Sequence, residues 1–375
     1  MDHLRDSTEN LQLLSELVLV PRPANCAGAQ QTLQMESTEP LLPFDLRAST
    51  LQTWEDLESL ATSNHVILRA FEPLHGMLEA AGNREGADWV ADSIQRERAR
   101  ITHALGFLER ICEALESARC PVTVIKSLDH WPDLGSDLDL YTDARAADVI
   151  KVMSAQFGAS LADRSWGDRL ANKWNFIVPG LPELVEVHVG RLGQTGEQTA
   201  ITRSLVNRVH RIQFGSHNLR LAALEDRIVI STLQRMYRHF YIRLCDIADN
   251  ARLLDSHAVD FEYLRSLGSA AGLWEGIATY LRIVSEYVAA YRGDGVPLPS
   301  FVARAAKFGS NQIRFRRQFL RVPILPHSLN LYATELKSLL RNGELRNGLR
   351  LSLLPCLATA AAVELKISGS DKGIW

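Results

Sequence analysis

The chain of 375 residues carries 41 lysine and arginine residues against 44 aspartate and glutamate residues, so its formal net charge is −3. A protein with this balance is not, as a whole, an electrostatic binder of nucleic acid. Its apolar content of 46% and charged content of 23% are ordinary for a globular protein, and its length suffices for two or three domains.

Residues 1–94 are predicted to form an N-terminal arm with helices. Residues 53–82 and 87–118 show apolar side chains at helical spacing, and prolines interrupt the segment before residue 50. The five cysteines are scattered, which favours a reducing compartment and argues against a zinc site. The polar N-terminus shows no signal peptide. We therefore expect a cytoplasmic protein.

Residues 95–222 are predicted to form a small α/β domain. Short β-branched or alternating runs indicate strands at 121–125, 137–142, 173–178 and 184–189, with a helix over 144–157. A glycine-rich loop is expected after Gly190. These elements favour an α+β fold, in which a small mixed sheet is flanked by helical N-terminal and C-terminal regions.

Residues 223–375 are predicted to form a helical domain. Helices are expected at 224–241, 243–254, 261–267, 274–291, 301–320 and 328–340. The most apolar segment, residues 351–363, is too short to span a bilayer. We expect it to form a buried helix, with an amphipathic membrane contact as the alternative, and we expect no stable membrane span.

Two carboxylates in the strand at 137–142 are the strongest chemical signal. Asp137 and Asp139 are separated by Leu138, so both project from one face of the strand. Adjacent carboxylates repel each other unless a cation lies between them. Oxygen ligands of this kind suit Mg²⁺, which usually brings a phosphate-bearing substrate.

A third carboxylate lies in the strand at 184–189. Glu186 and His188 share one face of this strand, opposite three valines. A charged residue within an apolar strand is costly unless it faces a polar site or water. Glu186 is therefore predicted either to meet Asp137 and Asp139 at a metal, or to face water from an edge strand. His188 is predicted to contact phosphate or acceptor, or to form a hydrogen bond beside the sheet.

The segments at 124–127, 135–140, 185–188 and 243–248 resemble those of the bacterial uncharacterised nucleotidyltransferase family, within the DNA-polymerase-β-type nucleotidyltransferase superfamily. The resemblance covers roughly residues 95–260. It implies that Asp137 and Asp139 bind two Mg²⁺ ions and the triphosphate, and that Glu186 completes the metal that activates an acceptor hydroxyl. Pyrophosphate would leave.

The chain departs from this family at the phosphate-binding turn. The family usually carries Gly-Ser or Gly-Gly about ten residues before the first aspartate, whereas this chain has Lys126-Ser127. Lys126 can offer a point charge to phosphate, and Ser127 a hydroxyl and a backbone N–H. Ser136, beside Asp137, is a further candidate for binding the nucleotide.

Several other polar residues are weaker candidates. Lys173 and Arg191 could meet phosphate or lie on the surface, and Asp246 could pair with Arg243 along a helix or line the cleft. His130 and Trp131 could stack on a base, although local packing is favoured. The stretches 203–243 and 304–350 are rich in arginine and could form either solvated helix faces or a basic wall.

These observations favour an Mg²⁺-dependent transferase that moves a nucleoside monophosphate from an NTP to a hydroxyl or phosphate acceptor. The acceptor would be a small molecule, sugar phosphate, peptide or protein, with RNA less favoured. One alternative is transfer from a nucleotide-sugar or another phosphate-linked donor. The other is a non-catalytic protein that senses a nucleotide or acts as a scaffold.

Overall fold

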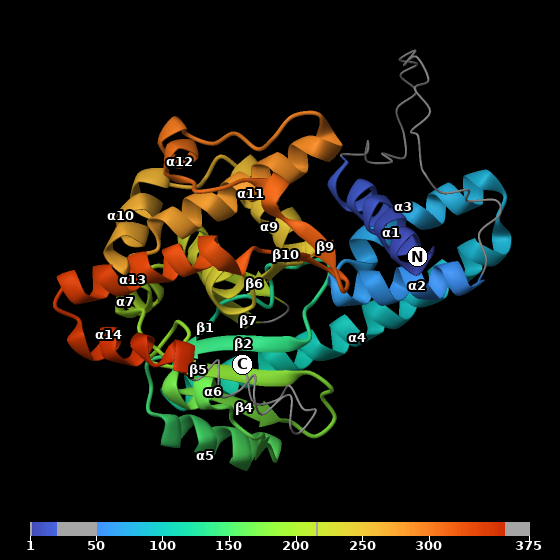
Figure 1. Cartoon of the computed structure of the whole chain (residues 1–375). Helices are drawn as coiled ribbons and strands as arrows, with labels where there is room; N and C mark the ends of the chain where they lie inside the picture. Colours follow the sequence, from blue (N-terminus) through green and yellow to red (C-terminus); the bar gives the residue numbers. More distant parts are fainter. Residues whose placement is uncertain (1, 21–50, 215–216, 357–375) are drawn as a thin grey trace.

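The computed structural model describes residues 2–20, 51–214 and 217–356. Helices occupy both ends of this chain, and a mixed seven-stranded sheet lies between them in the sequence (Figure 1). This combination agrees with the predicted α+β class.

The N-terminal region consists of α1 (Asp2–Leu19), α2 (Leu51–Ser63), α3 (Ile67–Ala81) and α4 (Arg84–Ser117). Helix α3 ends at Gly82, whose φ of +76° is readily adopted only by glycine. The side chain of Asn83 then accepts a hydrogen bond from the Gly86 N–H and caps the start of α4. Helix α4 is 34 residues long and contacts α3 as well as strands β1 and β7, so it links the N-terminal helices to the sheet.

The large sheet has the strand order β3-β4-β5-β2-β1-β7-β6. Its strands are β1 (Val122–Val124), β2 (Asp137–Thr142), β3 (Ser160–Leu161), β4 (Lys173–Ile177), β5 (Leu184–Val189), β6 (Val209–Phe214) and β7 (His217–Ala222). Strands β2 and β5 run parallel, as do β1 and β7, and the remaining neighbours are antiparallel. Strands β2 and β5 therefore lie inside the sheet, where both of their edges are paired.

Three helices connect these strands: α5 (Ala146–Phe157), α6 (Trp166–Leu170) and α7 (Thr199–Asn207). Figure 1 shows α5 on one side of strands β2, β4 and β5, and the C-terminal helices on the other side. One face of β2 and β5 is turned toward the C-terminal region, since residues of both line one pocket.

The C-terminal region begins with α8 (Leu224–Thr232), which continues as a π-helical turn (Leu233–Arg238). Its other helices are α9 (Leu244–Asp255), α10 (Phe261–Ala271), α11 (Trp274–Arg292), α12 (Ser300–Ala305), α13 (Leu329–Arg341) and α14 (Leu345–Ser352). A second sheet has the order β8-β10-β9, from β8 (Tyr241–Ile242), β9 (Arg314–Arg316) and β10 (Phe319–Arg321).

One continuous apolar core includes side chains from the N-terminal helices, the large sheet and the C-terminal helices. The division at residues 94 and 222 stays a prediction. Within the described ranges, none of the helices combines the length and the apolar character that a bilayer crossing needs. Of the predicted helix at 351–363, residues 357–363 lie outside the described part. Leu351 and Leu354 are buried, whereas Leu353 is 44% exposed.

Three predictions about the elements are wrong. Residues 301–320 do not form one helix, because β10 pairs with β8 and Phe319 stacks on Tyr241 with ring centroids 4.4 Å apart. The helix predicted at 224–241 is confirmed over residues 224–238, as α8 and a π-helical turn, but its predicted end is wrong because Tyr241 begins β8. Residues 190–222 contain α7 and the β6–β7 pair beside the expected loop, so the sheet is larger than predicted.

Candidate functional site

The candidate site lies on one face of the large sheet, where β2 and β5 run side by side. Asp139 on β2 is the register partner of Glu186 on β5, and Asp137 is the partner of Leu184. Because alternate residues of a strand point to the same face, Asp137 and Asp139 share a face with Glu186 and His188. The sheet therefore brings together residues that are about fifty positions apart in the sequence.

The opposite face of these strands is apolar core. Leu138, Leu140, Val185 and Val187 are fully buried there, as the alternation in the sequence predicts. The alternative in which Glu186 faces water from an edge strand is wrong, because β4 covers the outer edge of β5. The side chain of Glu186 is only 14% exposed.

Two lysines neutralise the carboxylates of this face. The Nζ of Lys126 lies 2.6 Å from Oδ1 of Asp139. The Nζ of Lys173, on β4, lies 2.8 Å from Oε1 of Glu186 and 3.1 Å from Oδ1 of Asp168. Each ammonium group therefore occupies a position beside a carboxylate oxygen that a metal ion would otherwise neutralise.

The hydroxyl groups of two serines form hydrogen bonds that hold strand β2 in place. The Ser127 hydroxyl accepts a hydrogen bond of 2.7 Å from the backbone N–H of Asp139. The Ser136 hydroxyl donates to Oδ2 of Asp137 over 3.2 Å. The Lys126-Ser127 turn thus positions β2 through a side chain, whereas the predicted contact of Ser127 with phosphate stays a prediction.

Burial and the neighbouring charges shift the pKa values of the three carboxylates. Burial raises the pKa of Asp137, and the Glu186 carboxylate raises it further. Burial raises the pKa of Asp139 to about 6, against the opposing effect of Lys126. Burial alone would raise the pKa of Glu186, but Lys173 and Lys126 outweigh it and lower this pKa to about 2.

His188 completes this group of side chains. Burial, together with the charges of Lys173 and Lys126, lowers the pKa of His188 well below its usual value, so the ring is neutral at pH 7. Its Nε2 lies 4.0 Å from Oδ1 of Asp139, and its buried Nδ1 has no hydrogen-bond partner among the described residues. A neutral imidazole with a free nitrogen is able to bind a metal ion.

The π-helical turn after α8 and the start of α9 close the site from the C-terminal side. Arg235 is buried, and its Nε lies 2.7 Å from Oδ2 of Asp246. Asp246 also accepts a hydrogen bond from the backbone N–H of Arg243. Of the two alternatives for Asp246, the ion pair with Arg243 is wrong because the paired side chain is that of Arg235, and Asp246 does not line the pocket. The guanidinium of Arg243 instead lies 5.5 Å from the ring centre of Tyr241.

We call the resulting cavity of about 210 Å³ the carboxylate pocket. Its charged lining comprises three carboxylates and five cationic side chains: Asp137, Asp139, Glu186, Lys126, Lys173, Arg235, Arg238 and Arg243. Ser127, Ser136 and the rings of His65, His130, His239 and Tyr241 also line it. Within the described ranges, Arg243 is the one cation of this lining with no ion-pair partner, so it is available to an anionic ligand.

The structure places the weaker candidates in different ways. His130 lines the carboxylate pocket, whereas Trp131 is 49% exposed and lies outside that lining. Arg191 also lies outside it, and its Nη1 donates to the carbonyl of Leu170. Lys173 lines the pocket, but its ammonium is already shared between two carboxylates.

A Cys/His cluster that the sequence does not reveal lies next to this pocket. His130, Cys245 and Asp249 bring potential metal-binding atoms within 4.8 Å of one another. However, one oxygen of Asp249 is 2.5 Å from Nδ1 of His130, and the other is 2.6 Å from Nη2 of Arg69. Burial raises the pKa of the Cys245 thiol. This cluster therefore fits a buried polar network better than a metal site.

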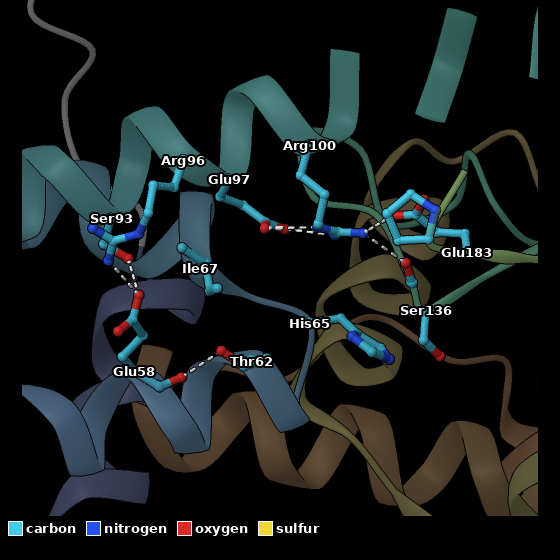
Figure 2. A pocket seen from close by; sticks show the side chains of 12 residues that line it. Glu58, Thr62, His65, Ile67, Ser93, Arg96, Glu97, Arg100, Ser136 and Glu183 are labelled. Carbon is cyan, nitrogen blue, oxygen red and sulfur yellow. Dashed lines mark hydrogen bonds and ion pairs between the residues drawn. The ribbon is translucent and has the colours of Figure 1, made fainter. Parts of the chain in front are cut away.

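A second cavity adjoins the carboxylate pocket (Figure 2). It has a volume of about 430 Å³ and shares His65, Gly135 and Ser136 with that pocket. Its further lining comes from α2, the start of α3, α4 and the segment before β5: Glu58, Thr62, Ile67, Ser93, Arg96, Glu97, Arg100, Pro182 and Glu183. Two adjoining cavities could hold two ligands near Asp137.

The sequence did not reveal most of the helical wall, and of the second cavity it singled out only Ser136. Arginine enrichment over 203–243 was a signal for the wall, but only Arg235, Arg238 and Arg243 from that stretch reach the pocket. No comparable signal indicated His65, His239 or the other residues of the second cavity. Comparison of the chain with protein-family models and with curated proteins finds no match.

Proposed function

We propose that the protein is a metal-dependent nucleotidyltransferase that moves a nucleoside monophosphate from an NTP to an acceptor hydroxyl. The observation that carries the proposal is the register of β2 and β5. This register puts Asp137, Asp139 and Glu186 on one sheet face, inside a pocket with a cationic wall. Carboxylates and cations in one small pocket are the complementary partners of a metal–triphosphate complex.

The residues of the sheet face suit a divalent cation. Asp139, Glu186 and His188 each offer a ligand atom, and these atoms lie within 4.8 Å of one another. Asp137 lies two residues before Asp139 on the same face. The carboxylates fit Mg²⁺ or Mn²⁺, whereas an imidazole is more typical of Zn²⁺ and other transition-metal ions. The two Mg²⁺ ions implied by the family resemblance stay a prediction, since the converging atoms describe one ion.

Metal binding would change the roles of the two lysines. An ion at Asp139 and Glu186 would compete with Lys126 and Lys173 for the same oxygens, because like charges repel at this distance. The freed ammonium groups would remain in the lining of the pocket, together with Arg243. There they would attract the oxygens of the triphosphate, which is the role predicted for Lys126.

The bound metal would supply charge neutralisation at the attacked phosphate and lower the pKa of the acceptor hydroxyl. The chain's own residues would orient the reactants. Ser127 fixes the backbone at Asp139, and Ser136 fixes the carboxylate of Asp137. The π-helical turn would hold Arg235 and Arg238 against the nucleotide side of the pocket.

Calorimetric titration of ATP, GTP, CTP and UTP with and without Mg²⁺ or Mn²⁺ tests this proposal. We expect one or more NTPs to bind only with a divalent ion, and the Asp137→Asn/Asp139→Asn variant to lose this binding. The exposed Asp143 follows β2 directly, so Asp143→Asn is a matched control that should bind as the wild type does. An absence of NTP binding by the wild type under all these conditions would rule the proposal out.

The ion pairs that Lys126 and Lys173 form with carboxylates favour a second candidate function. Because Lys126 and Lys173 already neutralise Asp139 and Glu186, the pocket could bind a nucleotide without metal and without catalysis. The same titration distinguishes the two functions. Metal-independent NTP binding that is lost in Lys126→Met would favour the non-catalytic nucleotide sensor.

A further inference from the structure

The charged residues that line the second cavity include more carboxylates than guanidinium groups. Figure 2 shows Arg96, Glu97 and Arg100 on one side of the cavity, with Glu58, Thr62 and His65 opposite. Three carboxylates, from Glu58, Glu97 and Glu183, face only the two guanidinium groups of Arg96 and Arg100.

Both arginines of the cavity already form ion pairs with carboxylates. Arg100 donates to Glu97 through Nε and Nη2, and its Nη1 lies 2.5 Å from Oε1 of Glu183. Its Nη2 also donates to the carbonyl of Leu134. Arg96 is divided between Asp92 and Glu58, and the Ser93 hydroxyl donates to the same oxygen of Glu58. The described lining therefore leaves no free guanidinium for an anionic ligand.

Glu183 carries the clearest sign of a missing partner. Its side chain is only 3% exposed, yet its Oε2 has no hydrogen-bond partner among the described residues. An unsatisfied buried carboxylate oxygen is costly, so a donor from a ligand would be favourable here. Across the cavity, the buried Nε2 of His65 also lacks a partner.

The position of Glu183 links the second cavity to the reacting groups. Glu183 directly precedes Leu184, which is the register partner of Asp137, and Ser136 directly precedes Asp137. The residues at the start of these two parallel strands meet at the same end of the sheet. A ligand at Glu183 therefore lies beside the shared boundary at Ser136, within one small-molecule length of the carboxylate pocket.

We propose that the second cavity binds the acceptor, and that this acceptor carries an ammonium group as well as a hydroxyl. This inference rests on the proposed function. The ammonium would donate to Oε2 of Glu183, and the hydroxyl would pass Ser136 toward Asp137. The hydroxyl oxygen would form a bond to the α-phosphorus of the NTP while the bond to the β-phosphate oxygen breaks. Pyrophosphate would leave, and the hydroxyl proton would go to water.

Matched pairs of small molecules that differ in one amine test the proposal. We would compare 2-amino-2-deoxyglucose with glucose and serinol with glycerol, by saturation-transfer NMR and calorimetry, in the absence of NTP. We expect an amine to bind the wild type about 10-fold more tightly than its neutral counterpart, as one charge-assisted hydrogen bond allows. Glu183→Gln should remove this preference, whereas the exposed Glu116→Gln on the same α4 helix as Arg100 should keep it.

The inference is overturned if no amine binds the wild type better than its neutral counterpart, or if Glu183→Gln keeps the preference. Should Glu183→Gln fail to fold, Thr62→Trp decides, because Thr62 is exposed on α2 and a tryptophan there would fill the cavity. Amine binding that persists unchanged in Thr62→Trp would also overturn the inference.

The two proposals fail separately in these experiments. Amine binding needs neither metal nor NTP, so Asp137→Asn/Asp139→Asn should retain it. If amines are preferred but no NTP binds, the proposed nucleotidyltransferase function is rejected, and so is the acceptor role that depends on it. Normal NTP binding without amine preference would reject only the inference about the second cavity.

Discussion

The carboxylate pocket and the second cavity both place carboxylates against cations, but they use different cations. In the carboxylate pocket the partners of Asp139 and Glu186 are lysines. In the second cavity Glu97 and Glu183 pair with Nη2 and Nη1, the two terminal nitrogens of the same Arg100 guanidinium. A lysine is a mobile point charge, whereas arginine forms several directional hydrogen bonds at once.

This difference separates carboxylates that can exchange their partner from carboxylates that are held in place. A metal ion could displace the ammonium of Lys126 without breaking a network of hydrogen bonds. Displacing Arg100 would break its hydrogen bonds to two carboxylates and to the carbonyl of Leu134. The comparison therefore predicts that the arginine is needed for folding and the lysine for the choice of ligand.

The largest expected effect is on stability, in Arg100→Met. Removing Arg100 leaves the buried Glu183 without a counter-charge, so the free energy of unfolding should fall by about 3 kcal/mol. Arg98→Met on the same helix removes only an exposed pair with Glu72 and should cost less than about 1 kcal/mol. Urea denaturation measures both, and equal losses in the two variants would contradict the comparison.

The next effect is on metal binding, in Asp139→Asn. Asp139 is the residue that β2 places opposite Glu186, and loss of a direct ligand should lower the affinity for Mn²⁺ by at least about 100-fold. Calorimetry with Asp143→Asn as the control measures this change. An Asp139→Asn variant with the affinity of the wild type would show that the ion, if any, binds elsewhere.

A smaller change in metal affinity, an increase rather than a decrease, is expected in Lys126→Met. This variant removes the cation that competes for Oδ1 of Asp139, so the affinity for a divalent ion should rise by about 10-fold. Lys151→Met, at an exposed position of α5, is the control. A fall in metal affinity in Lys126→Met would mean that the lysine supports the site rather than competing for it.

The last effect is on the pH dependence of stability, and it concerns two buried carboxyl groups, Glu197 and Glu335, that form no ion pair within the described ranges. Burial raises the pKa of Glu335 well above its usual value, and the neighbouring Glu197 raises it further. Glu197 accepts hydrogen bonds from the backbone N–H groups of Gln194 and Thr195, so we expect Glu335 to carry the proton. A raised carboxyl pKa stabilises the fold fully below the unfolded pKa near 4.5, and this stability is lost as the pH rises through the folded pKa.

Urea denaturation between pH 5 and pH 9 would measure this loss, with a slope of up to about 1.4 kcal/mol per pH unit. Glu335→Gln keeps a donor toward Glu197 and should flatten the profile. A wild-type profile as flat as that of the variant would show that Glu335 is not protonated in the folded protein.

Parts of this site were accessible from the sequence because strand periodicity is local. The alternation in 137–142 and 184–189 predicted which residues share a face, and both strands are confirmed. The sequence could not predict that Asp139 lies directly opposite Glu186, since the register of two strands depends on the whole sheet. Lys126 was predicted to contact phosphate, whereas its contact with Asp139 depends on that same packing.

Other elements lacked their usual local signals. The β9–β10 turn uses Arg317 and Gln318, whose φ values are +48° and +66°, in place of the Asn-Gly that commonly marks such hairpins. The second cavity combines α2, α4 and the residues before β5, so only the tertiary fold brings it together.

The most direct test of the account is a titration of the wild type with Mn²⁺, followed by electron paramagnetic resonance in the presence and absence of ATP. We predict that Mn²⁺ becomes immobilised at the sheet face, that ATP strengthens this binding, and that Asp139→Asn/Glu186→Gln abolishes it. Mn²⁺ that remains free in solution beside the wild type, with and without ATP, would contradict the proposal that these carboxylates form a metal–nucleotide site.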